Sequence, residues 1–172
     1  MKLLHTLAAV AATLALAGPQ LAPAASDADD GSRAEIRKAT GALLQQFYNA
    51  RPRLIPEVKA SSGYAIFTTH SGNLIGSPTT GGRGTGVALR TGESTEIFMA
   101  MRQTSADPNA PLDREFLIVF TSPKAFQEFA VRGWKDGAVV SDAKVYGLTT
   151  AGAVEVSPSL AGARFWNDAA LN

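Results

Sequence analysis

The sequence predicts an α+β fold, a single compact domain built on an antiparallel β-sheet or a barrel-like sheet. Two observations lead to this class. From Gly63 onward, short apolar segments of strand length alternate with turns that contain glycine. An N-terminal segment and a short one at about residues 122–132 instead place apolar residues at helical spacing. Runs of strands without regular strand–helix alternation favour antiparallel pairing.

The N-terminus has the features of a secretory signal peptide over residues 1–24. Lys2 supplies a positive charge, Leu3–Ala17 is apolar, and Ala22-Pro23-Ala24 offers small residues for cleavage. The apolar run is shorter than the roughly 20 residues that span a membrane. We therefore expect export, a flexible leader over 25–31 and one domain over 32–172.

Composition narrows the class of protein further. The chain has no cysteine, so neither a lipid-modified cysteine nor a disulfide is expected, and we predict a periplasmic or secreted protein that is not a lipoprotein. The 16 basic residues are nearly balanced by 15 acidic ones. A nucleic-acid partner is not expected, because nucleic-acid-binding domains usually carry a basic excess.

The first helix is predicted to begin at Ser32, which forms a capping box with Glu35. Two interpretations of its apolar stripe stay open: it packs on the domain core, or it also contacts lipid. The second rests on three basic residues that begin the polar side of the helix, Arg33, Arg37 and Lys38. The stripe consists of Ile36, Ala39, Thr40, Leu43, Leu44, Phe47 and Tyr48.

Proline and glycine delimit the later elements. The Arg51-Pro52 pair ends the first helix, and a further turn of helix is expected over Leu54–Ala60, close to Arg53. Ser122-Pro123 starts the short later helix and Gly133 ends it. Strands are predicted at 64–68, from 74, and at 85–90, 96–102, 116–120, 138–146, 153–156 and 160–166, with turns at 71–73 and 91–93, loops at 77–82 and 103–113, and a polar tail over 167–172.

The search for catalytic chemistry favours a non-enzymatic protein. His70 is the single histidine after residue 24, and Ser71 beside it lacks the strained turn of a nucleophilic serine. Without cysteine, one histidine does not make a zinc site, so neither a metal nor a cofactor is expected. Paired carboxylates stay possible from sequence alone.

The glycine-rich block Gly81–Gly86 lacks the lysine and the following helix of a phosphate-binding loop. One interpretation is a hairpin or bulged strand in which glycine permits close approach of the backbone. The other is a loop whose backbone N–H groups and Arg83 approach an anionic headgroup.

The order of several short motifs resembles the SYLF domain family, also called the Ysc84-type lipid-binding domain. The similarity covers about residues 40–170 and is closest to the secreted bacterial branch. The motifs are residues 55–58 (IPEV), 60–67 (ASSGYAIF), 72–76 (GNLIG), 81–87 (GGRGTGV), 117–120 (LIVF) with 122–129, 133–138 (GWKDGA), 145–152 (VYGLTTAG) and 160–168 (LAGARFWND).

The resemblance implies a compact antiparallel β structure with packed helices and binding to phospholipid membranes. In some members the N-terminal amphipathic region, here Ser32–Tyr48, takes part. The family's best-established ligands are phosphoinositides, which a bacterial envelope does not hold in abundance, so anionic phospholipid is the expected class here. The family's actin-binding activity is not carried over to an exported protein.

The leading hypothesis is thus a non-enzymatic, exported domain that binds anionic phospholipid or a membrane surface. The candidate lipid contacts are Arg33, Arg37, Lys38, Arg51, Arg53 and Arg83. The alternative is a periplasmic structural or protein-interaction module, with a protein as partner. An enzyme, such as a hydrolase with scattered acids, is the third possibility.

Overall fold

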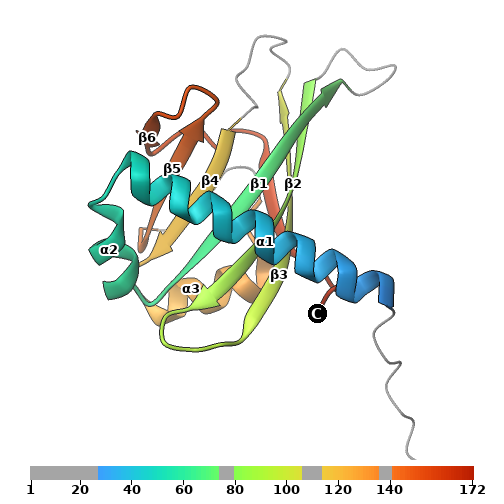
Figure 1. Cartoon of the computed structure of the whole chain (residues 1–172), viewed down its shortest axis with the longest axis horizontal. Helices are drawn as coiled ribbons and strands as arrows, with labels where there is room; N and C mark the ends of the chain where they lie inside the picture. Colours follow the sequence, from blue (N-terminus) through green and yellow to red (C-terminus); the bar gives the residue numbers. More distant parts are fainter. Residues whose placement is uncertain (1–26, 74–79, 106–113, 136–140) are drawn as a thin grey trace, which may run out of the picture.

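The computed structural model describes residues 27–73, 80–105, 114–135 and 141–172 (Figure 1). The elements along this part of the chain are α1 (Asp27–Ala50), α2 (Leu54–Ala60), β1 (Gly63–Asn73), β2 (Thr80–Arg90), β3 (Glu96–Ser105), β4 (Arg114–Phe120), α3 (Pro123–Arg132), β5 (Ala143–Thr149), β6 (Val154–Val156) and β7 (Ala163–Asn167). The α+β class predicted from the sequence is confirmed.

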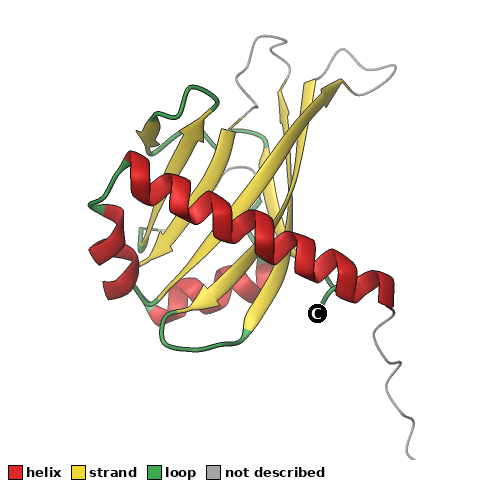
Figure 2. Ribbon diagram, viewed as in Figure 1, coloured by secondary structure: helices red, strands yellow, loops and turns green. Residues whose placement is uncertain are grey.

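The strands form one sheet in the order β6-β5-β4-β1-β2-β3-β7, and every neighbouring pair is antiparallel. The described strands make an open sheet with β6 and β7 at its edges. Helices α1 and α2 lie on one face and α3 on the other (Figures 1 and 2). The protein is therefore three layers thick, and each face of the sheet has its own apolar core.

The core under α3 is aromatic. Phe67 from the sheet meets Phe129 from α3, Phe116 meets Phe165 of β7, and Trp134 packs on Phe129. The Phe67 and Phe165 rings are 5.0 Å apart at 61°, within the edge-to-face arrangements that aromatic rings favour. These ring contacts thus stabilise the packing of α3 against the sheet.

The short helix α3 follows its sequence signals closely. The Ser122 side chain accepts a hydrogen bond from the Ala125 N–H, with Pro123 in the first turn. The helix ends at Gly133, whose φ of 65° favours glycine. Phe126 and Phe129, which the helical spacing of this segment places on one face, are both buried.

The core under α1 and α2 is more aliphatic. Leu43 and Phe47 of α1 are buried against the sheet, with Leu54 of α2 beside them. Among the sheet residues below them are Ile66 and Val87. The apolar stripe of the first helix therefore packs on the domain core, which is the first of the two interpretations, and Ala39 is the one member that is exposed.

Helix α1 begins at Asp27 rather than at Ser32, so the predicted capping box lies inside the helix. Acidic residues occupy the new first turn, where carboxylates interact favourably with the helix dipole. Asp30 also accepts a hydrogen bond from Arg33 one turn later, at 2.8 Å. Residues 27–31 of the predicted flexible leader are thus helical, and the predicted signal peptide over 1–24 lies outside the described residues.

The glycine-rich block is part of a long strand, β2, rather than a loop. Gly86 pairs with Phe67, and a Cβ added at Gly86 would lie 2.6 Å from Cδ1 of that ring. At Gly84 an added Cβ would lie 2.7 Å from Cγ of Met101. Because these distances are shorter than van der Waals contact, glycine is required where large side chains cross the strand.

Several further predictions of turns, loops and strands are wrong. Residues 80–82 and 103–105, expected in loops, belong to β2 and β3, and β7 begins at Ala163 rather than at 160. The residues at 71–73, expected to turn, extend β1 and pair with 80–82 of β2, because the hairpin ladder continues past the glycines. Strand β5 begins at Ala143, later than the predicted 138. The strand expected from 74, and the parts of predicted segments at 77–79, 106–113 and 138–140, lie outside the described residues.

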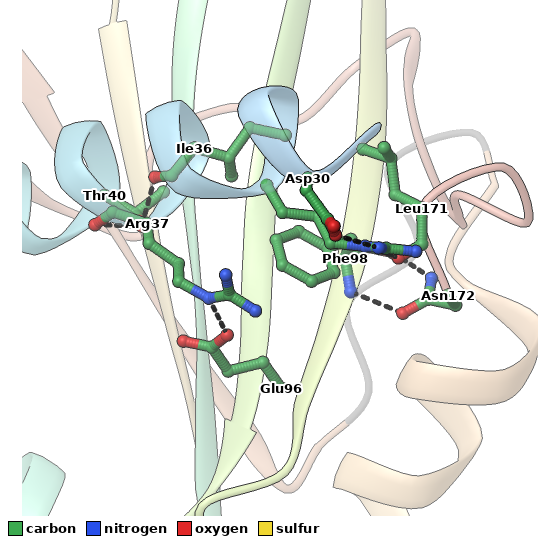
Figure 3. Close-up of polar contacts among 9 residues, drawn as sticks. Asp30, Ile36, Arg37, Thr40, Glu96, Phe98, Leu171 and Asn172 are labelled. Carbon is green, nitrogen blue, oxygen red and sulfur yellow. Dashed lines mark hydrogen bonds and ion pairs between the residues drawn. The ribbon is translucent and has the colours of Figure 1, made fainter. Parts of the chain in front are cut away.

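The segment after β7, expected as a polar tail, is packed against the sheet. The Phe98 N–H donates to Oδ1 of Asn172, and Nδ2 of Asn172 donates to the Phe98 carbonyl, each at 2.8 Å. The ladder between β3 and β7 ends at Met99 and Asn167, so the Asn172 amide extends it by one residue. This segment lies below the N-terminal half of α1 (Figure 3).

Candidate functional site

The structure places the six predicted basic residues on three separate parts of the molecule. Arg33 is engaged inside the fold, where its Nε donates to the Leu171 carbonyl and its Nη1 to Asp30, each at 2.8 Å (Figure 3). Arg37 forms an ion pair with Glu96. Both arginines therefore hold α1 against the sheet and the segment after β7.

The next three residues do not form one binding site. They are Lys38, Arg51 and Arg53. Lys38 and Arg53 are exposed on different elements. The Arg51 guanidinium lies 5.8 Å from the centre of the Tyr146 ring, in a cation–π contact. The phenol of Tyr146 in turn donates to Glu57 at 2.7 Å. Burial and that hydrogen bond raise the pKa of Tyr146 to about 12, so this group is a structural contact.

Arg83 is the predicted residue that the fold brings together with other cations. In the sheet register Arg83 pairs with Arg102, Arg102 pairs with Arg164, and His70 pairs with Arg83 on the other side. Directly paired residues of antiparallel strands project to the same face. We call Arg83, Arg102 and Arg164 the arginine row; all three are exposed, as is His70 at its end.

The arginine row lies on the α1 side of the sheet. Side chains alternate along a strand, so Arg83 shares a face with Val87, which belongs to the core under α1. Likewise Arg102 shares a face with Phe98. Strands β1 and β2 extend beyond the helix (Figure 1), and the exposed row lies on this uncovered part of the face.

No carboxylate among the described residues forms an ion pair with the row. Like charges placed directly opposite each other on neighbouring strands destabilise a sheet. Arg102 meets this penalty twice, because an arginine faces it on either side. A bound anion would remove the repulsion, so the arrangement is suited to an anionic ligand.

A hollow of about 480 Å³ adjoins the row, and we call it the tryptophan hollow. Trp166 pairs with Ala100, and Ala100 pairs with Thr85, so these three form the neighbouring row of the same face. Trp166 is 41% exposed, which is unusual for so large a side chain. The site thus combines guanidinium groups with an accessible aromatic ring and small residues between them.

A second hollow of about 490 Å³, the glutamate hollow, lies on the other side of His70. Glu115 lines it, and one oxygen of this carboxylate (Oε2) accepts a hydrogen bond from the Thr69 N–H at 2.7 Å. Burial raises the pKa of Glu115, although the Thr69 N–H and the nearby His70 act in the opposite direction. The two hollows have His70 as a common wall and carry opposite charge.

The expectation that the glycine-block backbone meets an anion is wrong. The residues from Gly81 to Gly86 pair with β1 on one side and β3 on the other. Their amides are therefore committed to sheet hydrogen bonds, and the block can face a ligand through the side chains of Arg83 and Thr85 instead.

Sequence reasoning missed Arg102, Arg164, Trp166 and Glu115. Each lies on a strand whose adjacent residues point to the opposite face, so no local cluster in the sequence marks it. The register of five neighbouring strands, β4, β1, β2, β3 and β7, brings these side chains onto one face of the sheet. Register cannot be read from one strand at a time.

Comparison with known proteins adds no family assignment. No protein-family model matches the chain, and no curated protein matches it. In the described part of the chain, no helix is long and apolar enough to cross a membrane. The same residues contain no cluster of three or more histidine or carboxylate side chains able to hold a metal ion.

Proposed function

We propose that this protein is a non-enzymatic, exported domain that binds anionic phospholipid surfaces through the arginine row. The observation that carries the proposal is the row itself, three exposed arginines paired across strands with no carboxylate partner in the described residues, beside an exposed tryptophan. The SYLF resemblance and the signal-peptide pattern belong to the same proposal.

The chemistry of the site fits a lipid headgroup. Guanidinium groups donate paired hydrogen bonds to phosphate oxygens. Each basic residue near an anionic membrane contributes about 1 kcal/mol of attraction. Tryptophan favours the interface between headgroups and acyl chains, and Trp166 is placed to reach it when Arg164, two residues earlier on the same face of β7, meets a phosphate.

The proposed contact surface differs from the one expected at the N-terminal helix. The apolar stripe of α1 is used in packing on the sheet, and Arg33 and Arg37 have partners within the protein. Of the six original candidates, Arg83 therefore has the strongest support. Lys38 and Arg53 stay available to an anionic surface as exposed charges.

Sedimentation with phosphatidylglycerol vesicles at low salt tests the proposal. We expect the mature protein to pellet with these vesicles and the R102Q variant to bind about fivefold more weakly, because one contact of about 1 kcal/mol is lost. The matched control is R132Q, an exposed arginine on α3 at the opposite face of the sheet. Equal loss in the two variants, or no pelleting of the unaltered protein, would refute the proposal.

A saturable protein partner would favour the periplasmic interaction module instead. Mixing the purified domain with an envelope extract and vesicles in competition distinguishes the two functions. The lipid-binding proposal predicts that R102Q lowers vesicle binding whether or not the extract is present.

A further inference from the structure

The tryptophan hollow and the glutamate hollow lie next to each other, and their charges indicate which lipid headgroup the site binds. The tryptophan hollow borders the arginine row, and the glutamate hollow holds the half-buried carboxylate of Glu115. His70 lines both. A ligand that lies across His70 therefore meets positive charge at one end and negative charge at the other.

Glu115 is able to bind a cationic group of a ligand. Its Oε2 accepts the Thr69 N–H at 2.7 Å, and no described residue hydrogen-bonds to the other oxygen, Oε1. No lysine or arginine of the described ranges forms an ion pair with it. A half-buried carboxylate without a counter-ion gains from a cation that enters its hollow.

The sheet geometry sets the separation of the two charges. Phe67 pairs with Phe116, so one step further along the register Glu115 lies beside Thr68 on β1. Glu115 is then two strands and two residues away from Arg83, or about 12 Å between backbones from the ordinary strand spacing and rise. Both side chains project from the same face, and arginine is long enough for its guanidinium to approach Glu115, so a headgroup with closely linked charges can reach both.

We infer that the site selects a phospholipid headgroup carrying both a phosphate and a primary ammonium group, with the phosphate at the arginine row and the ammonium at Glu115. This inference rests on the proposed function and deepens it. A primary ammonium donates three hydrogen bonds, which suits a carboxylate oxygen that accepts none from the described residues. A quaternary ammonium has no N–H to donate and is bulkier.

The test compares two vesicle compositions of equal anionic charge. Both contain phosphatidylglycerol; one contains phosphatidylethanolamine, and the other contains phosphatidylcholine in its place. We expect about fivefold tighter binding to the ethanolamine vesicles, which is the scale of one partly exposed ion pair. The E115Q variant loses this preference. It retains binding to pure phosphatidylglycerol vesicles at or above the unaltered level, because a negative charge beside the arginine row is gone.

The substitution is suited to this purpose because a glutamine side chain keeps an oxygen to accept the Thr69 N–H. E128Q, at an exposed position on α3, is the matched control and should keep the preference. Equal binding of the unaltered protein to the two compositions would overturn this inference alone, as would a preference that survives in E115Q. Absence of binding to every vesicle would instead overturn the proposed function.

Discussion

Removing the central arginine of the row should make the protein more stable. Arg102 faces Arg83 on one strand and Arg164 on the other. Favourable cross-strand pairs contribute about 0.2–1 kcal/mol each, and like charges directly opposite act in the destabilising direction, for which we take a similar scale. Because all three side chains are exposed, solvent screening places the total near the low end, at about 0.5 kcal/mol for the two pairs. We therefore expect R102Q to raise the free energy of unfolding by about that amount, or the melting temperature by roughly 1–2 °C.

The assay is thermal and urea unfolding followed by circular dichroism, at low and at high salt. The gain should disappear near 1 M salt, where the screening length falls to about 3 Å. R102K keeps the charge and is the matched control, so its stability should stay close to that of the unaltered protein. Lower stability of R102Q, or a gain that persists unchanged in high salt, would show that the row is not under electrostatic strain.

Three other predictions concern the fold. G86A should destabilise the protein by about 3 kcal/mol or more, since its Cβ would overlap the Phe67 ring, whereas G41A, in open space on α1, should stabilise it by about 0.5–1 kcal/mol; urea unfolding measures both. N172A should cost about 1–2 kcal/mol and expose the β3 amide it holds to hydrogen exchange. The pKa of Tyr146 is raised from 10.0 to about 12, so its contribution to stability is present below pH 10 and is lost as pH rises through about 12; in Y146F the free energy of unfolding should fall less steeply over that range.

Local signals in the sequence predicted the elements whose residues carry their own periodicity or caps. The run at 116–120 became β4, and Ser122, Pro123 and Gly133 bound α3 as expected. These signals act within one turn or one strand, so neighbouring residues are sufficient to define them.

The conformation of the glycine-rich block was harder to predict, because the side chains that require glycine there belong to other strands. Gly86 is in β2 beneath a phenylalanine from β1, and Gly84 is beneath a methionine from β3. Nothing next to these glycines in sequence shows which large side chains cross them. The sequence therefore favoured a hairpin or bulged strand over a loop for this block without showing why the glycines are needed.

The same limit applies to the candidate site. Arg83, Arg102 and Arg164 are spread over about 80 residues of the chain, and the register of three strands sets them side by side. In contrast, Arg33 and Arg37 lie close together on one helix and suggested a binding site from the sequence. In the structure they are bound by Leu171 and Glu96 from distant segments. Local charge clusters were therefore a poor guide to which arginines are free.

The fluorescence of Trp166 tests the central claim most directly. Trp166 is 41% exposed, whereas Trp134 is 6% exposed in the aromatic core, so Trp166 should dominate any response to a membrane. We predict a shift of the tryptophan emission to shorter wavelength when phosphatidylglycerol vesicles are added, and the loss of that shift in W166F. An unchanged spectrum of the unaltered protein despite vesicle binding, or the same shift in W166F, would contradict the account.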